Sequence, residues 1–549
     1  MNPAEDAVQE VSIQTGNYSA EYGVYAGVHV NFALKSGTNS FHGSGWEFLE
    51  RTSLNARNFF SPTVAPLHQD QFGGSFGGPI RKDKTFFFGS YQGFRSSSSA
   101  HIDQTVLTTA ERTGDLSQDV NGNPIPIFDD PTTGQPFPLV NRKPNQIPMD
   151  RISPTALAAI SILEPTPNSS GPNNWQENLT FPSPYNQETI KIDNVFNQKD
   201  TLSGRYWETK STLYLGGGTA GNIGNNIIPV DTYCFGLTET HTLSPLAVLA
   251  SRFSFNRNTE AELYNQFPQT IDTRKLFDMS IPSSIGPGDI MNTYPLFTVP
   301  GYTAMGTTGN IPLASQPDEN YEIASTLNLI RGKHSVNIGF DFYRLRSGRL
   351  VNDNTNGEMT FAAGNPNGTG NALADFMLGF PDSSTVALAP IVADMRHTIA
   401  DFFIADKWRV TNRLTIEPGI RYEMDFPLNE HWGRFPVFNF APAPGSFTQL
   451  APGQGIWQVS MRNWAPRLGI NYELTSKTVI RTAFGMFYDY PPELEMTFKG
   501  ANPPYITTYN FQSAPGAALT AGNAFPIGQA LSGSVVSPQA FQTNVKRRA

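Results

Sequence analysis

Along most of this chain, apolar and polar side chains alternate one by one, which is the pattern of β-strands with one apolar and one polar face. Residues 414–425 show it most clearly. Their apolar set is Leu414, Ile416, Ile420, Tyr422 and Met424, and their polar set is Thr415, Glu417, Arg421, Glu423 and Asp425. The same alternation recurs in residues 321–329, 335–342 and 467–474. The pattern predicts long amphipathic strands.

The connections between these strands are of two kinds, very short and very long. Short turns lie at residues 81–84, 197–200, 244–245, 331–334, 411–413 and 475–477, and long loops rich in Pro, Gly and Asn at 51–68, 96–187, 210–232, 258–320, 347–395 and 426–463. Strands of about nine to eleven residues joined in this way are typical of a transmembrane β-barrel. A soluble sandwich or propeller would also alternate, but connections longer than about 15 residues are uncommon in compact domains.

Residues 17–49 form a junction between two structures. Residues 28–34 are predicted to be one strand, residues 35–39 a polar turn, and the next segment a second strand with Trp46 and Phe48 on one face. Counting that second strand together with six hairpins predicts an all-β, antiparallel barrel-type sheet of about thirteen strands. The tail from Pro491 is predicted to be a loop that does not return as a strand.

The composition agrees with an all-β chain. Of the 549 residues, 15% are charged and 12% aromatic, and there are 48 Gly and 43 Pro. A net charge of −9 without a long basic run argues against nucleic acid as a partner. No apolar run reaches about 18 residues, so the sequence predicts no transmembrane helix. The single cysteine, Cys234, is predicted to be a small buried or lipid-facing hydrophobe.

Three motifs that imitate active or metal sites do not carry the chemistry. The segment Gly73–Gly77 matches a nucleophile elbow, but no helix follows it, so Ser75 is predicted to be an ordinary strand residue. Asp119, Asn121, Asn123 and Asp130 imitate a calcium loop, but Pro124 stands where a glycine must turn; a looser oxygen site stays open. The eight histidines, at 29, 42, 68, 101, 241, 334, 397 and 431, are scattered without zinc spacing.

The acidic residues are likewise spread through strands and loops, so no acid–base pair stands out. We therefore expect no catalytic residue, no metal ion and no cofactor, and a protein that is not an enzyme. One short helix is predicted at residues 155–163, with Ser153 as its cap and Pro154 at its first position. It would lie in the longest loop, where it packs against that loop or contacts cargo.

Five segments together resemble the Oar-like branch of TonB-dependent outer-membrane receptors. They are YSAEYG with GVHVNFALKSGTN (residues 18–39), LNARNFF (54–60), QFGGSFGGPI with KDKTFFFGSY (71–91), TGDLS (113–117), and NQIP with RISP (145–154). The resemblance is dense over residues 8–168 and continues as strand rhythm to about residue 490. The first segment is similar to the end of the plug domain, where a glycine-rich strand leads into the first barrel strand.

The resemblance implies a barrel of about 22 strands filled by a plug, located in the cell outer membrane. It further implies passage of a large or scarce substrate, driven by an energising inner-membrane complex. Outer-membrane lipid and that complex would be the partners. Relative to the family pattern, a signal, a regulatory-like domain, the box that contacts the energiser, most of the plug and a terminal aromatic strand are not found in this sequence. We therefore expect a fragment.

That expectation divides the chain into three parts. Residues 1–39 would be the C-terminal remnant of the plug, residues 40–490 a partial barrel, and residues 491–549 a truncated loop-like tail.

The alternative function is a secreted soluble β-protein that binds carbohydrate. It would require a dry core between sheets and aromatic side chains on an exposed loop platform. A hydrolase built on Ser75 would require parallel strands with helices, which this turn-rich pattern does not offer.

Overall fold

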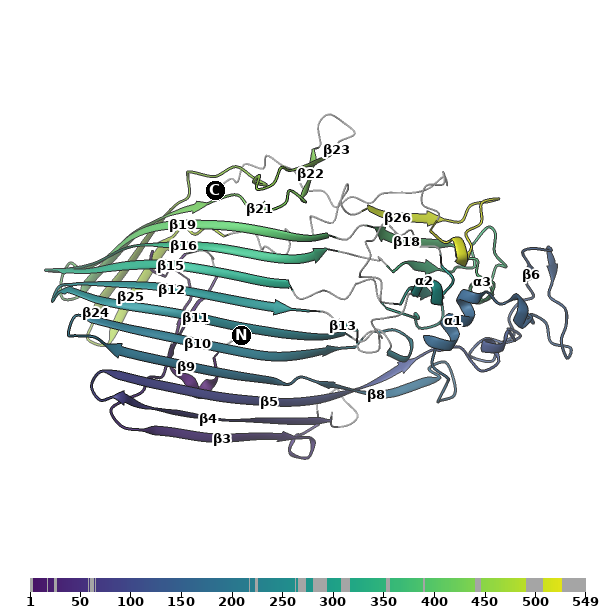
Figure 1. Cartoon of the computed structure of the whole chain (residues 1–549), viewed down its shortest axis with the longest axis horizontal. Helices are drawn as coiled ribbons and strands as arrows, with labels where there is room; N and C mark the ends of the chain where they lie inside the picture. Colours follow the sequence, from purple (N-terminus) through teal and green to yellow (C-terminus); the bar gives the residue numbers. More distant parts are fainter. Residues whose placement is uncertain are drawn as a thin grey trace.

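The computed structural model contains one large antiparallel sheet whose strands connect at one end by short turns (Figure 1). It describes residues 3–16, 18–23, 27–57, 59, 64, 66–216, 218–222, 226–261, 263–264, 273–279, 294–307, 316–351, 356–388, 391–439, 446–489 and 507–525. In this part of the chain no helix combines the length and the apolar character needed to cross a membrane. The prediction of an all-β chain is confirmed.

Thirteen strands follow one another along the hydrogen-bonded path of this sheet, as the sequence predicts. They are β3 (His42–Arg51), β4 (Leu67–Arg81), β5 (Thr85–Gln104), β9 (Tyr185–Val195), β10 (Asp200–Leu215), β11 (Asn226–Ser244), β12 (Ala247–Glu260), β15 (Gln316–Arg331), β16 (His334–Val351), β19 (Ile391–Arg409), β20 (Leu414–Asp425), β24 (Trp464–Thr475) and β25 (Thr478–Gly485). Three further strands pair with members of this path: β8 (Trp175–Pro182), β13 (Leu263–Tyr264) and β21 (Asn429–Glu430).

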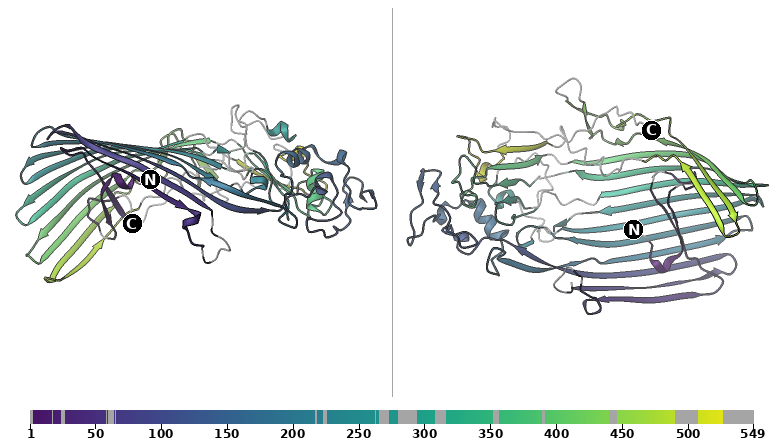
Figure 2. Two further views of the ribbon diagram at one scale, coloured as in Figure 1. Left: turned by 90° about the horizontal axis from the view of Figure 1, so that it is seen from below. Right: turned by 180° about the vertical axis from the view of Figure 1, so that it is seen from behind.

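All six predicted hairpins are present, each between sequence-adjacent strands. The β15–β16 connection has only two residues between the paired Arg331 and His334, and Gly332 has a φ of 61°. A positive φ is what a tight hairpin turn requires, and glycine adopts it without steric cost. Figure 2 shows that the sheet curves into an open trough. Among the described strands, β3 and β25 are its edges.

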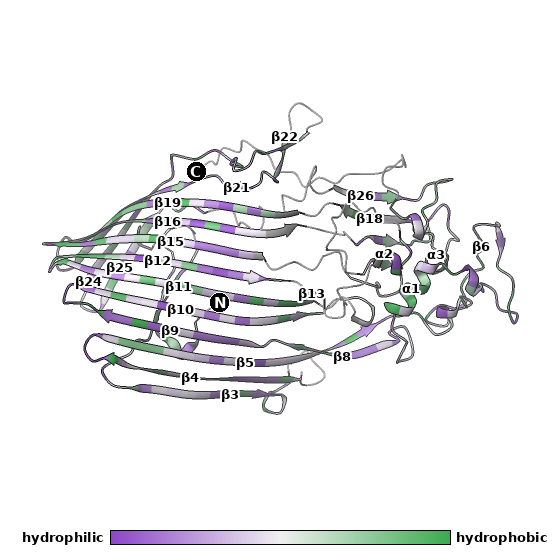
Figure 3. Ribbon diagram, in the orientation of Figure 1, coloured by the Kyte–Doolittle hydropathy of each residue, from purple (hydrophilic) through white to green (hydrophobic). Residues whose placement is uncertain are grey.

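The two faces of the sheet have the opposite burial from a soluble protein. On β19, Phe402 and Ile404 are 51% and 45% exposed, whereas Asp401, which points to the opposite face of the strand, is fully buried. On β20, Ile420 is exposed while Arg421 and Glu423 are fully buried. Apolar and polar residues alternate along these strands in Figure 3. The apolar faces thus point outward as a belt, not into a dry core between two sheets, so the soluble alternative lacks its structural requirement here.

The N-terminal residues lie on the concave, polar face of the trough (Figure 2). They comprise the short 3₁₀ helix η1 (Glu5–Ala7) and two antiparallel strands, β1 (Val8–Gln14) and β2 (His29–Leu34). The predicted strand over residues 28–34 is therefore present as β2, and the predicted second strand as β3. The two belong to different sheets, since β2 pairs with β1 and β3 pairs with β4.

The long loops fold into a packed region at the end of the sheet opposite the short turns (Figure 1). Its helices are α1 (Pro154–Ile162), α2 (Thr273–Leu276) and α3 (Ala372–Leu378), and its main sheet has the order β14 (Leu296–Thr298), β17 (Glu358–Thr360), β18 (Ser383–Leu388) and β26 (Thr507–Gln512). The largest cluster of buried apolar side chains lies here, from Val106 to Phe525. We call this part the loop domain.

The remaining short elements lie in the connections. They are β6 (Asp129–Asp130) paired with β7 (Gln135–Pro136), β22 (Pro436–Asn439) paired with β23 (Ser446–Gln449), and the 3₁₀ turns η2 (Thr52–Leu54), η3 (Glu111–Thr113), η4 (Met149–Arg151), η5 (Ala220–Asn222) and η6 (Ala521–Asn523). The predicted helix at residues 155–163 is present as α1, and Ser153 caps it by accepting a hydrogen bond from the Ala156 N–H at 3.1 Å.

The tail beyond residue 491 differs from the prediction. Its described part returns as β26, which pairs antiparallel with β18 over six residues, and Phe511 and Phe525 are buried in the loop domain. Among the described residues, its neighbour in the sheet is residues 383–388, more than a hundred positions earlier. A pairing at that sequence distance leaves no local turn signal, so the pattern alone could not reveal it.

Candidate functional site

The candidate site is the contact between the N-terminal residues and the polar face of the sheet, which we call the lumen face. Buried charged side chains gather there on β16, β19 and β20. Each is placed by strand alternation, because Asp341, Asp401 and Arg421 occupy the positions between the outward apolar residues. Charges are rarely buried unless they are paired, so these residues mark an organised polar centre.

Arg421 lies at the middle of this centre and is fully buried. Its Nη2 donates to Asp401 Oδ2 at 2.6 Å and to Asp341 Oδ2 at 2.9 Å. Its Nη1 donates to two backbone carbonyls of the N-terminal segment, Ala20 at 3.3 Å and Glu21 at 3.0 Å. One guanidinium therefore joins three elements: two strands of the sheet and the segment on its concave face. The planar fork of arginine suits such multiple, fixed contacts.

Arg467 on β24 makes a second anchor for the same segment. Its Nη1 donates to the carbonyl oxygens of Tyr18 at 3.2 Å, Tyr22 at 2.6 Å and Ser19. Its guanidinium carbon lies 5.0 Å from the ring centroid of Tyr18 and 4.3 Å from that of Phe487. Residues 18–22 are thus bound through their backbone by two arginines and flanked by aromatic rings.

Close approach of the backbones requires small residues at two positions. A Cβ added to Gly23 would collide with the Arg421 guanidinium, and one added to Gly419 would lie 2.9 Å from the Cβ of Ala20. Both positions belong to the contact that the two arginines make. The glycine at the end of the YSAEYG segment therefore has a steric role in this docking.

A third anchor holds the start of the chain to β3 and β4. The Asp6 carboxylate accepts hydrogen bonds from Ser75 Oγ at 2.6 Å and Ser44 Oγ at 2.7 Å, and Lys35 Nζ lies 3.0 Å from it. Ser75 is a residue of strand β4, as predicted, and here its hydroxyl binds a carboxylate of the N-terminal segment. Lys191 on β9 adds a hydrogen bond to Ser36 Oγ at 2.6 Å.

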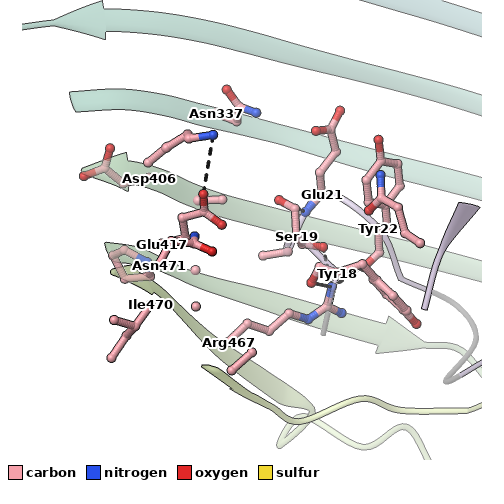
Figure 4. Close-up of a pocket in the computed structure, with 18 of the residues that line it drawn as sticks. Tyr18, Ser19, Glu21, Tyr22, Asn337, Asp406, Glu417, Arg467, Ile470 and Asn471 are labelled. Atoms are coloured by element: carbon pink, nitrogen blue, oxygen red, sulfur yellow. Dashed lines mark hydrogen bonds and ion pairs between the residues drawn. The ribbon is translucent and has the colours of Figure 1, made fainter. Parts of the chain in front are cut away.

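Beside the arginine anchors lies a cavity of about 690 Å³, near the short turns (Figure 4). Tyr18, Ser19, Glu21 and Tyr22 line one side of it, and residues of β16, β19, β20, β24 and β25 line the other. Lys407 and Glu417 form an ion pair of 3.5 Å across its wall. The lining is polar and charged, so the cavity suits water and polar solutes.

The structure does not assemble the imitation calcium loop. The Asp119 carboxylate accepts hydrogen bonds from the backbone N–H groups of Asn121 and Asn123, at 2.9 and 2.8 Å, which is a side-chain-stabilised turn. Asp130 instead pairs with Arg151 at 2.8 Å. These contacts, together with Pro124 at the turn, explain the sequence motif without an ion.

One group that the sequence analysis did not identify is formed by Asp200, Glu239 and His241. Their potential ligand atoms lie within 4.8 Å of one another, and His241 Nδ1 contacts Asp200 Oδ1. Among the described residues it is the one cluster of three or more such side chains close enough to hold a metal ion. Glu239 and His241 are two apart on β11 and Asp200 is the cross-strand partner of His241. Finding them from sequence requires the strand register.

Cys234 is half-buried on β11, opposite Trp207 of β10. It shares the lumen side of the strand with Gly236 rather than the outward side, where Phe235 is exposed. The prediction was a buried or a lipid-facing side chain; the structure has a half-buried one on the lumen side, so the lipid-facing option is wrong.

Burial changes the pKa of several ionisable groups in the loop domain. Burial raises the pKa of Glu164 to about 8, although its Oε1 accepts a hydrogen bond from the Leu107 N–H at 2.6 Å. Burial likewise raises the pKa of Asp375 to about 6. Burial also raises the pKa of Tyr302, whose hydroxyl donates to Glu111 Oε1 at 2.5 Å. The charge of Arg112, whose Nη1 donates to the Glu164 backbone carbonyl at 3.0 Å, opposes the effect of burial on the pKa of Glu164 but does not overcome it.

Comparison with known proteins agrees with this architecture. Residues 33–549 match the family model described as an outer membrane beta barrel domain. The TonB-dependent transporter Oar of Myxococcus xanthus is 30% identical over 185 residues, which cover 30% of this chain and 17% of Oar. The match agrees with the resemblance to the Oar-like branch inferred from the motifs.

Solved structures of low identity are also similar. The outer membrane transporter YddB from Escherichia coli has a TM-score of 0.46 at 10% identity, covering 90% of this chain and 49% of YddB. The siderophore receptor PirA from Acinetobacter baumannii has a TM-score of 0.45 at 12% identity, covering 88% and 48%. The chain spans about half the length of these solved relatives and about a sixth of the curated one.

Proposed function

Because this chain belongs to the outer membrane beta-barrel domain family, we propose that it forms part of the barrel wall of a TonB-dependent transporter. In this proposal residues 1–39 are the end of the plug, residues 40–490 are barrel strands with their loops, and residues 491–549 are a tail. The outward apolar belt contacts outer-membrane lipid, and the loop domain lies outside the cell, since bacterial barrels have short periplasmic turns and longer external loops.

The observation that carries this proposal is the docking of the N-terminal segment on the lumen face. A barrel without cargo function has no need of a separate segment held inside it by Arg421, Arg467 and the Asp6 contacts. These anchors are hydrogen bonds to backbone carbonyls and to one carboxylate, beside a cavity with a polar lining. Contacts of this kind can be exchanged for water, so the segment can be displaced to open a path.

The activity we propose is energised passage of a large or scarce substrate. An inner-membrane energising complex would pull on the plug, and the arginine anchors would hold residues 18–22 in place until that force is applied. Passage involves no covalent chemistry, so this chain is proposed to have no catalytic residue and no cofactor. The match to a transporter, Oar, supports that class of function.

We further propose that additional strands close the sheet. Strands alternate in direction along the path from β3 to β25, so the first and the thirteenth run the same way. Closure by antiparallel pairs alone then requires an odd number of further strands between β25 and β3. Lipid does not tolerate unpaired strand edges, which is the physical reason for closure.

The test is where the chain resides when it is produced with an export signal in a Gram-negative host. We expect it in the outer-membrane fraction, with electrophoretic mobility in detergent that changes on heating, as for folded barrels. Recovery as a monodisperse, water-soluble folded protein would overturn the proposal.

A further inference from the structure

A second cavity lies between the N-terminal segment and the lumen face of β4, β5, β9 and β10. Its volume is about 640 Å³, comparable to that of small-molecule sites in general. Residues 3–11 form one wall, and Gln71, Gln92, Gln187 and Thr209 belong to the other, with Tyr185 and Phe32. The two arginine anchors described above lie elsewhere, on β20 and β24, whereas the Asp6 and Lys191 contacts involve β3, β4 and β9.

The wall of this cavity is built from uncharged hydrogen-bonding groups. Gln92 and Gln187 are cross-strand neighbours, and Gln187 in turn faces Thr209. Gln187 Nε2 donates to Thr209 Oγ1 at 3.0 Å. No Lys, Arg or His is among the described residues that line the cavity, and the charged ones are Glu5 and Glu10. Anionic ligands are therefore disfavoured here, in contrast to the arginine-containing cavity near the short turns.

Gln92, in the wall of this cavity, carries a buried acceptor that is not used. Its side chain is only 4% exposed, and its Nε2 donates to Tyr185 Oη at 2.7 Å. That bond fixes the amide, and its Oε1 has no hydrogen-bond partner among the described residues. An acceptor buried without a donor is costly, so a ligand hydroxyl or amide N–H that reaches it is favoured.

A row of similar groups lies next to it, one step toward the short turns. Ser90, Thr189 and Trp207 are cross-strand neighbours on β5, β9 and β10. Their Oγ, Oγ1 and Nε1 atoms are buried, and none has a hydrogen-bond partner among the described residues. The lumen wall therefore carries two successive rows of uncharged donors and acceptors under the N-terminal segment.

Aromatic rings complete the cavity. Tyr185 stacks on Phe94 with ring centroids 4.9 Å apart and an interplanar angle of 16°, which holds it in place. Phe32 of β2 faces the cavity from the plug side. Amides and hydroxyls that bind hydroxyl groups, beside rings that pack on the C–H faces of a sugar, match the chemistry of a neutral carbohydrate.

We propose that this cavity binds an uncharged oligosaccharide and that the two polar rows form its track along the lumen. The proposal rests on the proposed transport function and names its substrate class. The sugar occupies the cavity beside Gln92, and it reaches the buried polar atoms of Gln92, Ser90, Thr189 and Trp207 when residues 3–11 move away. The polar atoms of Ser90, Thr189 and Trp207 have no hydrogen-bond partner while they are covered. Moving residues 3–11 away therefore breaks no hydrogen bond to these atoms.

The test uses the full chain in detergent and two sets of hexasaccharides. The neutral set is malto-, cello-, xylo- and mannohexaose, and the acidic set is hexagalacturonate and a heparin hexasaccharide. Binding is followed by calorimetry and by tryptophan fluorescence, for which Trp207 is a reporter. We expect at least one neutral sugar to bind with a submillimolar Kd and the acidic sugars to bind at least tenfold more weakly. Absence of neutral binding, or equal acidic binding, would overturn the proposal.

Two variants locate the site. Gln92→Leu removes the amide at similar volume, and Thr209→Val removes one hydroxyl isosterically. Each substitution is expected to raise the Kd for the neutral sugar at least fivefold. Gln176→Leu, an exposed amide on β8, is the matched control and should leave the Kd unchanged. Unchanged binding by Thr209→Val and Gln92→Leu would contradict the assignment. Outer-membrane location of the same samples tests the transport function separately, so either proposal can fail alone.

Discussion

Arg421 is the residue on which the contacts of the lumen face converge. It satisfies two buried carboxylates and two backbone carbonyls at once. Arg421→Met would leave Asp401 buried without its cation and Asp341 with Arg252 alone, at a cost of about 3–5 kcal/mol, and release residues 20–21. We expect the N-terminal segment to become accessible to chymotrypsin at Tyr18 and Tyr22.

Arg413→Met is the control, because Arg413 is exposed in the β19–β20 turn. It should leave the digestion pattern of the N-terminal segment unchanged. Equal protection of residues 18–22 in Arg421→Met and in the unmodified chain would show that this arginine does not hold the segment.

Glu164 makes the stability of the loop domain depend on pH. Its pKa is raised to about 8 in the folded state against an ordinary value of 4.5. The neutral form is therefore the one the fold favours, and its contribution is fully present below pH 4.5 and is lost as the pH rises through 8. At about 1.4 kcal/mol per unit of pKa, the loss is on the order of 5 kcal/mol.

Thermal unfolding of the loop domain, followed by the buried Trp175, should thus shift to lower temperature between pH 5 and pH 9. Glu164→Gln should reduce that shift strongly, whereas Glu177→Gln, at an exposed position, should not. A steep pH dependence that survives in Glu164→Gln would assign it to other groups, of which Asp375 is the first candidate.

At the scale of single residues, the sequence indicated where polar side chains occur on each strand but not which of them meet. The face of Arg421 is evident from alternation, yet its contacts with Ala20 and Asp341 join positions 401 and 80 residues apart. The Asp200, Glu239 and His241 cluster likewise depends on the register of β10 against β11. Register is set by neighbouring strands together, so one strand read alone does not contain it.

At the scale of elements, the alternating faces make a direct prediction about lipid. Phe402 lies in the outward belt between Phe340 and Tyr422 of the neighbouring strands. Phe402→Arg should destabilise the inserted state by about 2–4 kcal/mol, as for cations placed in the middle of a barrel's lipid face. Asn337→Arg, which points into the polar cavity near the short turns, should cost much less.

Urea titration of folding into liposomes measures both changes. The account requires Phe402→Arg to have the larger effect. Similar effects of the two substitutions would contradict the assignment of lipid and lumen faces.

The strand β26 makes a separate prediction, because it attaches the tail to the loop domain. Phe511 is 4% exposed and belongs to the core of that domain. Phe511→Ala should destabilise the loop domain by about 3–5 kcal/mol through the cavity it leaves. Proteolysis should then cut residues 507–525 earlier, while Phe196→Ala, an exposed site at a short turn, should have no such effect. Unchanged resistance would mean that β26 is not a stable part of the domain.

Strands and short turns were predictable because their signals are local: period-two alternation, and turns such as Gly332-Lys333 between paired residues. The way in which the long loops fold into the loop domain was not predictable from such local signals. Its core joins segments from Val106 to Phe525, and its four-strand sheet pairs residues 296–298, 358–360, 383–388 and 507–512. Each piece is too short to show a period of its own, and only their association buries enough apolar surface.

At the scale of the whole molecule, three parts of the structure have separate roles in the proposed transporter. The sheet supplies an apolar outer face and a polar inner face, the N-terminal segment covers the inner face, and the loop domain stands at the entrance. The contacts between segment and sheet are mostly polar, with one small apolar cluster of Ala4, Ala7 and Phe88, whereas the loop domain is held by a large apolar core. The N-terminal segment is therefore suited to being displaced, and the loop domain is suited to staying folded.

The central claim is that the outward face of the sheet lies in lipid while the inward face does not. Its most direct test is a scan of single spin labels along residues 399–406 of β19 in reconstituted membranes, with accessibility to oxygen and to a water-soluble nickel chelate measured at each position. The account predicts alternation with a period of two, with oxygen favoured at Phe402 and Ile404 and depressed at Asp401 and Phe403. Uniform accessibility along the strand, or the opposite phase, would contradict it.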